Sequence, residues 1–444
     1  MKHVKRCVPV LAFNRLNECL QTDIPLFKFE KEVFYFVLDL FYRLPAFNKQ
    51  IQYTDTGLIR ISSKYFGKYV TKGYAKYLNY LIKHKIIECD KIKKVGKSYG
   101  YRMVPEFDSK ILRIKIPSTT NIAKRIIENY NKRKKYHKKL PEHIKEMKSH
   151  FKKQMKINLE EALGWLEREL SQKNISLNQY NVLLLSVYAI DDQELFFNVN
   201  NTNGRIDSNL TNLKSELRQF IIGDYHHIDC QNSQPLIVNF ITEYINENSN
   251  KQFQEQEPHN ITTPSLGDDK EKILQKELNN SDLEYLKFFP KMSKKALEEF
   301  GQFRDDTFNQ DFYRAIQSKY EVLYGKQILR SDVKEIIYKV FFSRNRSFPN
   351  EKKIFRELYP TIYSVIHKLK KQRHNKFALC LQRIESEIFI QRIAKRLVES
   401  GIIPLTIHDS IVVLAPDKEL ALQIMKEEYV AFLKQSPKFI CTEF

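Results

Sequence analysis

The chain has 444 residues and a formal net charge of +21, from 74 lysines and arginines against 53 aspartates and glutamates. Because both signs are abundant, the excess is not a basic tail but a general property that favours a polyanionic partner, most commonly a nucleic acid. The 42% hydrophobic content suffices for two or three domains, and we find neither a membrane-spanning run nor a secretory leader, so we expect no membrane partner.

The six cysteines are scattered without a Cys-x-x-Cys pair. This spacing indicates reduced thiols and a cytoplasmic location, and it argues against a zinc site.

Residues 27–107 form the first predicted compact unit, after an expected N-terminal extension of residues 1–26. Apolar patterning and caps predict, in order, a helix (29–42), a short strand (58–61), two helices (62–69 and 72–85) and two strands (86–92 and 99–104). The last helix carries Lys72 and Lys76, and Lys94 and Lys97 lie in the tip between the last strands. This order resembles a winged helix-turn-helix, whose second helix and wing contact duplex DNA. A small α/β domain with ordinary solvated lysines is the alternative.

The next segment, 108–198, is predicted to be helical and is very basic between residues 121 and 156. A charge run is usually a solvated face. Here its density favours contact with a phosphate backbone.

The segment Asn203-Gly204-Arg205 lies in a polar stretch before the next strand. Glycine allows the backbone to approach a partner closely, and Arg205 beside it can reach a groove edge or a phosphate. An ordinary surface loop is the alternative.

Two aspartates then end predicted strands far apart in the chain. Asp229 closes a strand-like run before a polar turn and an apolar helix, and Asp409 lies at the tip of a predicted hairpin over 402–414. A β-turn alone would explain Asp409. Together, the two aspartates can share a pair of divalent ions, as two-metal phosphoryl transfer requires, and Mg²⁺ is the natural choice.

A helix predicted from Arg330 onward carries the third informative pattern. One side shows two cations and then two rings at intervals of four: Arg330, Lys334, Tyr338 and Phe342. The other side is apolar and should face the core: Val333, Ile336, Ile337, Val340 and Phe341. Cations for phosphates and rings for base and sugar suit a nucleoside triphosphate. An amphipathic helix with incidental charges is the alternative.

In this order, the stretches resemble the polymerase domain of family A DNA polymerases and of the phage-type single-subunit RNA polymerases. Residues 203–208 are similar to the family's Thr-Gly-Arg segment, and Asp229 matches the aspartate of the first catalytic motif. The helix from Arg330 to Phe342 matches the fingers helix, and His408-Asp409 the last motif. The resemblance covers residues 199–444.

The resemblance implies an α+β fold: a right-hand polymerase with palm, fingers and thumb, preceded by the winged helix-turn-helix-like domain. The expected divisions are an extension (1–26), a winged-helix-like DNA-binding domain (27–107), a basic helical linker and thumb (108–198), the first part of the palm (199–243), a mobile polar insertion (244–282), the fingers (283–376) and the second part of the palm (377–444).

The resemblance also implies roles for individual residues. The expected catalytic residues are Asp229, Asp409 and Lys334. Two Mg²⁺ ions, with Mn²⁺ as a substitute, would be held by Asp229, Asp409 and the backbone carbonyl of Cys230. The expected substrate-binding residues are Arg330, Lys334, Tyr338, Phe342 and Gln234. The expected nucleic-acid-binding residues are Arg205, His408, Gln382, Lys72, Lys76, Lys94 and Lys97.

Departures from the family pattern leave the choice of sugar open. Gln234 stands where the DNA enzymes carry a glutamate that blocks ribonucleotides, and Phe342 replaces the usual tyrosine. We expect a template-directed nucleotidyltransferase that extends a primer on DNA from nucleoside triphosphates, and we favour a DNA polymerase of a mobile element or phage. One alternative is a single-subunit RNA polymerase or primase-like enzyme, with RNA as a partner. The other is a catalytically inactive, DNA-binding replication initiator or regulator.

Overall fold

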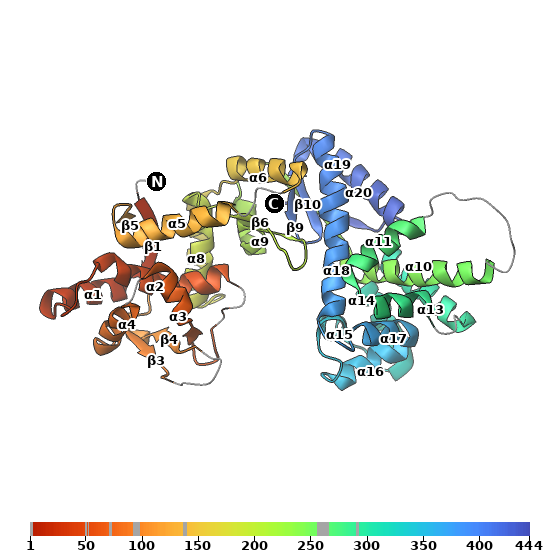
Figure 1. Ribbon diagram of the computed structural model, residues 1–444, viewed down its shortest axis with the longest axis horizontal. Coiled ribbons are helices and arrows are strands. Elements are labelled where there is room, and N and C mark those ends of the chain that lie inside the picture. The colour runs from red at the N-terminus through yellow and green to blue at the C-terminus, as the bar shows by residue number, and fades with distance from the viewer. Residues whose placement is uncertain are drawn as a thin grey trace. The chain divides into compact units, whose positions relative to one another are not determined.

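The computed structural model describes residues 3–48, 51, 53–70, 73–91, 98–135, 140–254, 266–289 and 293–444. The fold mixes helices with small antiparallel sheets (Figure 1). The chain divides into two compact units: unit 1 comprises 1–145, 152–196 and 208–222, and unit 2 comprises 146–151, 197–207 and 223–444. Within the described ranges, no helix combines the length and the apolar character needed to cross a membrane.

Unit 1 contains β1 (His3–Pro9), α1 (Val10–Thr22), α2 (Lys31–Phe47), β2 (Ile59–Arg60), α3 (Ser63–Tyr69), α4 (Tyr74–Lys83), β3 (Ile87–Cys89), β4 (Gly100–Met103), η1 (Pro105–Phe107), β5 (Ile111–Pro117), α5 (Asn121–Lys135), α7 (Leu159–Ser171), α8 (Leu177–Asp191), α9 (Asn209–Asn212) and η2 (Ser215–Phe220). Helix α6 (Glu142–Gln154) has residues in both units.

The elements from α2 to β4 follow the order expected from the sequence. The strands form an antiparallel sheet in the order β2-β4-β3. The predicted N-cap of α3 is confirmed, because the Ser62 hydroxyl accepts a hydrogen bond from the Tyr65 amide at 3.2 Å. Lys76 is exposed on α4, whereas Lys72, Lys94 and Lys97 lie outside the described residues.

The N-terminal segment is integrated into unit 1. Strand β1 pairs antiparallel with β5 along its whole length, from His3 opposite Pro117 to Pro9 opposite Ile111. The side chains of Val4, Cys7 and Val8 are buried, and α2 packs on α8. Unit 1 therefore includes residues from all three of the segments expected from the sequence: 1–26, 27–107 and 108–198.

A buried carboxylate joins β1 to α2. Asp39 is fully buried, accepts a hydrogen bond from the Cys7 amide at 2.8 Å and receives the Arg43 Nε at 2.5 Å. The Arg6 Nε lies 3.6 Å from the same carboxylate. Two cations thus offset the cost of burying this charge.

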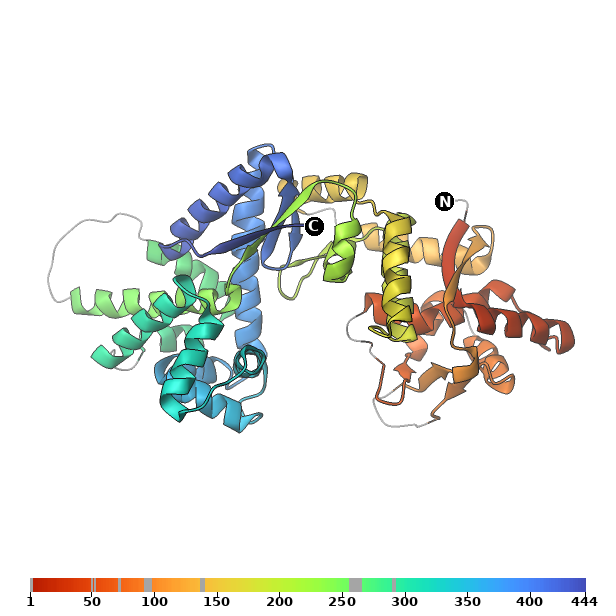
Figure 2. The same cartoon turned by 180° about the vertical axis from the view of Figure 1, so that it is seen from behind.

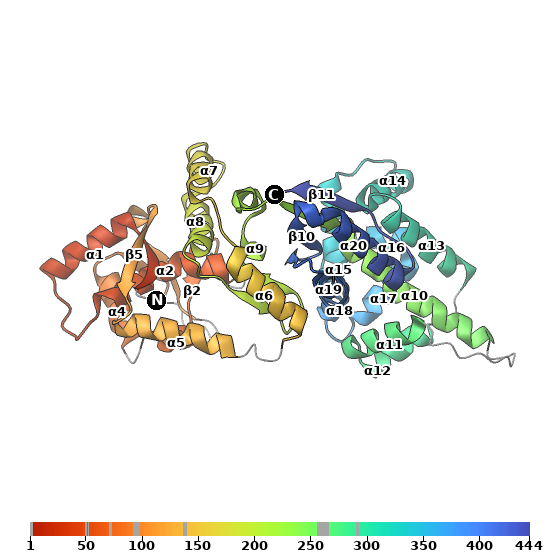
Figure 3. The ribbon, with the colours of Figure 1, turned by 90° about the horizontal axis from the view of Figure 1, so that it is seen from above.

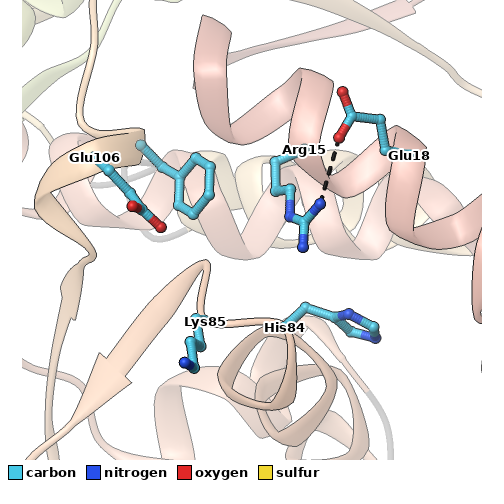
Figure 4. A pocket seen from close by; sticks show the side chains of 6 residues that line it. Arg15, Glu18, His84, Lys85 and Glu106 are labelled. Atoms are coloured by element: carbon cyan, nitrogen blue, oxygen red, sulfur yellow. Dashed lines mark hydrogen bonds and ion pairs between the residues drawn. The ribbon is translucent and has the colours of Figure 1, made fainter.

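A hollow of about 410 Å³ in unit 1 is lined by side chains of mixed charge (Figure 4). Its lining residues are Arg15, Glu18, His84, Lys85, Glu106 and Phe107. None of them belongs to the predicted site.

Unit 2 contains β6 (Phe197–Val199), β7 (Ile206–Ser208, except its last residue, which belongs to unit 1), β8 (Tyr225–Cys230), α10 (Ser233–Gln254), α11 (Leu266–Glu277), α12 (Asn280–Lys287), α13 (Lys294–Phe308), α14 (Phe312–Tyr324), α15 (Arg330–Phe342), α16 (Pro349–Leu358), α17 (Pro360–Leu369), α18 (Lys376–Ser386), the π-helix η3 (Glu387–Ile393), α19 (Ala394–Glu399), β9 (Leu405–Ile407), β10 (Ser410–Leu414), η4 (Ala415–Asp417), α20 (Lys418–Leu433) and β11 (Phe439–Glu443).

The central sheet of unit 2 has the antiparallel order β11-β8-β10-β9. Strand β8, yellow-green in Figure 2, runs among the blue strands of the C-terminal part. The hairpin predicted over 402–414 is confirmed as β9 and β10. Helices α18 and α19 continue through η3 as one long helix (Figure 1), which packs on α10 and α20.

The remaining helices of unit 2 gather beside α10 and α18 (Figure 3). In α15, the apolar side predicted from the sequence is buried as expected: Val333, Ile336, Ile337, Val340 and Phe341. The stretch 244–282, expected to be a polar insertion with little to bury, is helical over 244–254, 266–277 and 280–282. There, Ile273 and Leu274 are buried, and the buried Lys270 pairs with Glu243 and Glu247.

Candidate active site

The central sheet of unit 2 brings Asp229 and Asp409 together although they lie 409 − 229 = 180 positions apart. Asp229, on β8, is paired with Ser410, the first residue of β10. Asp409 directly precedes Ser410, and its carbonyl accepts a hydrogen bond from the Cys230 amide at 3.3 Å. Antiparallel pairing therefore places both carboxylates at one end of neighbouring strands.

Both turns beside these aspartates contain a non-glycine residue in the left-handed region. His408, at the hairpin tip, has φ 53°, and Asn232, after β8, has φ 62°. Such conformations cost free energy and concentrate at functional sites. Asn232 is held there because its Nδ2 donates to the carbonyls of Thr307 and Gln310 at 3.1 Å each.

The two aspartates share a poorly compensated negative charge. Burial raises the pKa of Asp229 to about 7, and the charge of Asp409 adds to the increase. Burial also raises the pKa of Asp409, against a backbone hydrogen bond and the charge of Arg205, which lower it. Neither carboxylate forms an ion pair with a cationic side chain in the part of the chain that the structure describes. A bound cation would relieve this repulsion.

Two aspartates fit the way in which proteins bind Mg²⁺. No group of three or more His, Cys, Asp or Glu side chains arranged to hold a metal occurs among the described residues. Mg²⁺, however, is usually held by one or two carboxylates, with water and substrate phosphates completing its shell. The residues present therefore fit this ion, and a role for the Cys230 carbonyl stays a prediction.

Glu385, on α18, is a site residue that sequence reasoning missed. Its side chain is 1% exposed and accepts hydrogen bonds from Arg205 Nε at 2.7 Å, from Ser233 Oγ at 3.3 Å and from Gln234 Nε2. Burial raises its pKa to about 7; Arg205 lowers it, and the charge of Asp409 raises it. The one available signal was its position a single turn after Gln382, on an otherwise apolar helix face.

The glycine of the Asn203-Gly204-Arg205 segment lies close to the chain's own helix α18, whereas the predicted approach to a nucleic acid stays a prediction. Gly204 has φ 75°, and a Cβ there would lie 3.0 Å from the Ser386 Cβ. The Ser386 hydroxyl donates to the Asn203 carbonyl at 2.8 Å, and the Asn203 Nδ2 donates to Gln382 at 3.3 Å. Arg205 is thereby directed to Glu385, and binding of nucleic acid by Arg205, Gln382 and His408 stays a prediction.

The two predicted triphosphate-binding cations share one aromatic ring that sequence reasoning did not include. The Arg330 guanidinium lies 4.9 Å and the Lys334 Nζ 5.6 Å from the centre of the Tyr313 ring. Arg330 also pairs with Asp311 at 2.8 Å. Burial raises the pKa of Tyr313, and among the smaller contributions the charge of Asp409 raises it further. Tyr313 therefore contacts both cations of α15, and the charge of Asp409 acts on its hydroxyl.

Of the two rings of α15, Tyr338 is exposed and Phe342 is partly exposed. The Tyr338 side chain is 65% exposed, and its ring centre lies 5.0 Å from that of Phe342. Lys334 is exposed on the same side of the helix. One face of α15 therefore offers a cation and two rings, as the spacing predicted.

Neither a protein-family model nor a curated protein matches this chain. One solved structure that matches is the POL domain of Pol1 from M. smegmatis in complex with DNA primer-template and dNTP, at 10% sequence identity and a TM-score of 0.29. The match covers 63% of this chain and 54% of that one. A TM-score this low does not establish a shared fold.

Proposed function

We propose that this chain is a nucleotidyltransferase that extends a nucleic-acid primer from nucleoside triphosphates, as a template-directed DNA polymerase. The observation that carries the proposal is the meeting of Asp229 and Asp409 at one end of the central sheet. A bound cation would offset the repulsion between their two carboxylates. The cationic face of α15 supports the proposal, because Lys334 lies over the ring of Tyr313, on whose hydroxyl the charge of Asp409 acts.

The roles of the residues follow from their charges. Asp229, Asp409 and the Cys230 carbonyl would hold the Mg²⁺ or Mn²⁺ ions. When bound, two such ions activate the attacking hydroxyl and stabilise the leaving oxygen. Arg330 and Lys334 would hold the triphosphate and stabilise the charge that develops on the departing pyrophosphate.

The proposed architecture is a right hand. The sheet β11-β8-β10-β9 would be the palm, and the helices from α13 to α17 the fingers. In unit 1, the order helix, strand, two helices and two strands supports a winged-helix-like DNA-binding part, with Lys76 exposed on its second short helix. A thumb within 108–198 and an origin in a mobile element or phage remain part of this proposal.

The test is a primer-extension assay with the full chain, in which dNTPs and NTPs are offered separately with Mg²⁺. The wild type should incorporate nucleotides, and Asp229→Asn and Asp409→Asn should abolish incorporation while retaining binding to duplex DNA. Asp224→Asn is the matched control: Asp224 precedes the same strand and its side chain is 77% exposed. Substantial synthesis by Asp409→Asn would refute the metal assignment.

A second candidate function uses ribonucleotides in place of deoxyribonucleotides. Gln234 is an amide where the DNA enzymes have a carboxylate, and Phe342 has no hydroxyl, so an RNA polymerase or primase-like enzyme would be favoured if NTPs alone were incorporated. DNA binding without any incorporation would favour the inactive initiator or regulator instead.

A further inference from the structure

Two buried lysines lie beside the end of α15, and neither has an acidic partner. Lys352, on α16, and Lys370, directly after α17, are each 3% exposed. Neither forms an ion pair with a carboxylate in the part of the chain that the structure describes. By contrast, the buried Lys270 pairs with Glu243 and Glu247. A buried cation without a carboxylate is costly, so Lys352 and Lys370 require other acceptors.

Those acceptors are backbone carbonyls at the end of α15 and in the loop that follows. Lys370 Nζ donates to the carbonyl of Val340, in the last turn of α15. Lys352 Nζ donates to the carbonyls of Arg344 and Ser347. The last four carbonyls of an α-helix have no partner within the helix. The two lysines therefore supply hydrogen-bond donors that this end of α15 and its loop need.

The segment 340–348, which we call the α15 corner, is held at one further place. Asn345 Nδ2 donates to the carbonyl of His367, on α17, at 2.9 Å. Burial, together with the charge of Lys352, lowers the pKa of Lys370 to about 7. An ammonium group and a neutral amine both donate N–H bonds, so Lys370 can keep its bond to α15 in either form. The corner is thus fixed from α16 and α17, and α16 packs on both α15 and α17 (Figure 1).

The α15 corner contains Phe342, the last residue of the helix. Helix ends fray first, most readily where their carbonyls lack partners. Lys334 lies 342 − 334 = 8 positions earlier, more than two turns from this end. Loss of either buried lysine should therefore release the ring of Phe342 and leave Lys334 in place.

We propose that Lys352 and Lys370 are positioning residues that fix the end of α15, so that Phe342 meets the bound nucleoside triphosphate in one orientation. This inference rests on the proposed nucleotidyltransferase function. It explains why two cations are buried here without a carboxylate, because their acceptors lie on the segment that they position.

The first test measures single-nucleotide incorporation by Lys370→Met and Lys352→Met. Methionine has a similar length and suits a buried site, but it cannot donate a hydrogen bond. Each variant should raise KM for the nucleoside triphosphate by roughly two- to tenfold, the range expected for one hydrogen bond, and change kcat little. The exposed neighbours give matched controls: Lys371→Met and Lys353→Met should leave KM unchanged.

A double-mutant cycle separates positioning from a general structural role. If Lys370 acts through Phe342, then Lys370→Met should add little to the KM of Phe342→Ala. The same substitution should act independently of Lys334→Ala, because Lys334 lies toward the other end of α15. Equal additivity with Phe342→Ala and with Lys334→Ala would overturn the proposal.

Hydrogen exchange gives a readout that requires no activity. The amides of residues 340–348 should exchange faster in Lys370→Met and Lys352→Met than in the wild type. Because methionine also removes the cost of burying a charge, the midpoint of urea unfolding should change little. Unchanged exchange in the α15 corner, or faster exchange throughout unit 2, would contradict the positioning role.

The outcomes separate the two proposals. A wild type that incorporates no nucleotide refutes the proposed function and this inference with it. Incorporation by a wild type whose KM and corner exchange are matched by Lys370→Met and Lys352→Met refutes this inference alone.

Discussion

Replacing Asp229 with asparagine should stabilise the metal-free protein at alkaline pH. The pKa of Asp229 is raised from 3.8 to about 7 in the folded chain, so the folded state binds this proton more tightly than the unfolded state. The stabilisation that results is complete below 3.8 and is lost as the pH rises through about 7. Above that pH, the ionised carboxylate opposes folding.

The size of the effect follows from the two pKa values. Their difference corresponds to about 4 kcal/mol. Because the side chain is only half-buried, solvent screening reduces this, and we expect about 2 kcal/mol. Asparagine has no charge to desolvate, so Asp229→Asn should unfold at higher urea than the wild type at about pH 8 and show little gain at about pH 4.

The assay is urea unfolding followed by circular dichroism, with chelator or with Mg²⁺. Mg²⁺ should stabilise the wild type at alkaline pH and have little effect on Asp229→Asn, because the variant lacks one of the two carboxylates. Asp224→Asn is the control and should behave as the wild type. If metal-free Asp229→Asn were no more stable than the wild type at alkaline pH, the cost assigned to burying an ionised Asp229 beside Asp409 would be wrong.

Three further predictions concern other parts of the chain. Lys334→Ala should slow incorporation of dNTPs and of NTPs equally, by roughly a hundred- to a thousandfold. Phe342→Tyr should instead change the ratio of kcat/KM for dNTPs to kcat/KM for NTPs. If Phe342→Tyr left this ratio unchanged, Phe342 would have no part in sugar selection. Gly204→Ala should destabilise the protein by about 1 kcal/mol or more, measured by urea unfolding, because of its positive φ and its contact with α18. Asp39→Ala should destabilise unit 1 by about 1–3 kcal/mol, because the buried Cys7 amide loses its acceptor and Arg43 keeps only Glu194 as an acidic partner among the described residues; an unchanged midpoint of urea unfolding would contradict this.

Elements with local signals could be predicted from the amino-acid sequence. The alternation of apolar and polar positions in α15 is enough to identify its core side, including Val333 and Phe341. The two β-branched runs around Asp409 predict the hairpin, and Ser62 marks the start of α3. These patterns are readable because helices and hairpins satisfy their hydrogen bonds within a few residues of sequence.

Which distant segments meet depends on tertiary packing. Nothing in residues 3–9 indicates a pairing with residues 111–117, because the sequence of one strand does not identify the strand with which it pairs. For the same reason, sequence reasoning missed Glu385. Its importance depends on Arg205 and Gln234, which come from elements more than 150 positions away, and a glutamate in a helix is otherwise an ordinary surface residue. The aspartate pair was predictable only in part. Local patterns placed each Asp at the end of a strand, whereas the pairing register of β8 against β10, which tertiary packing decides, brought the two charges together.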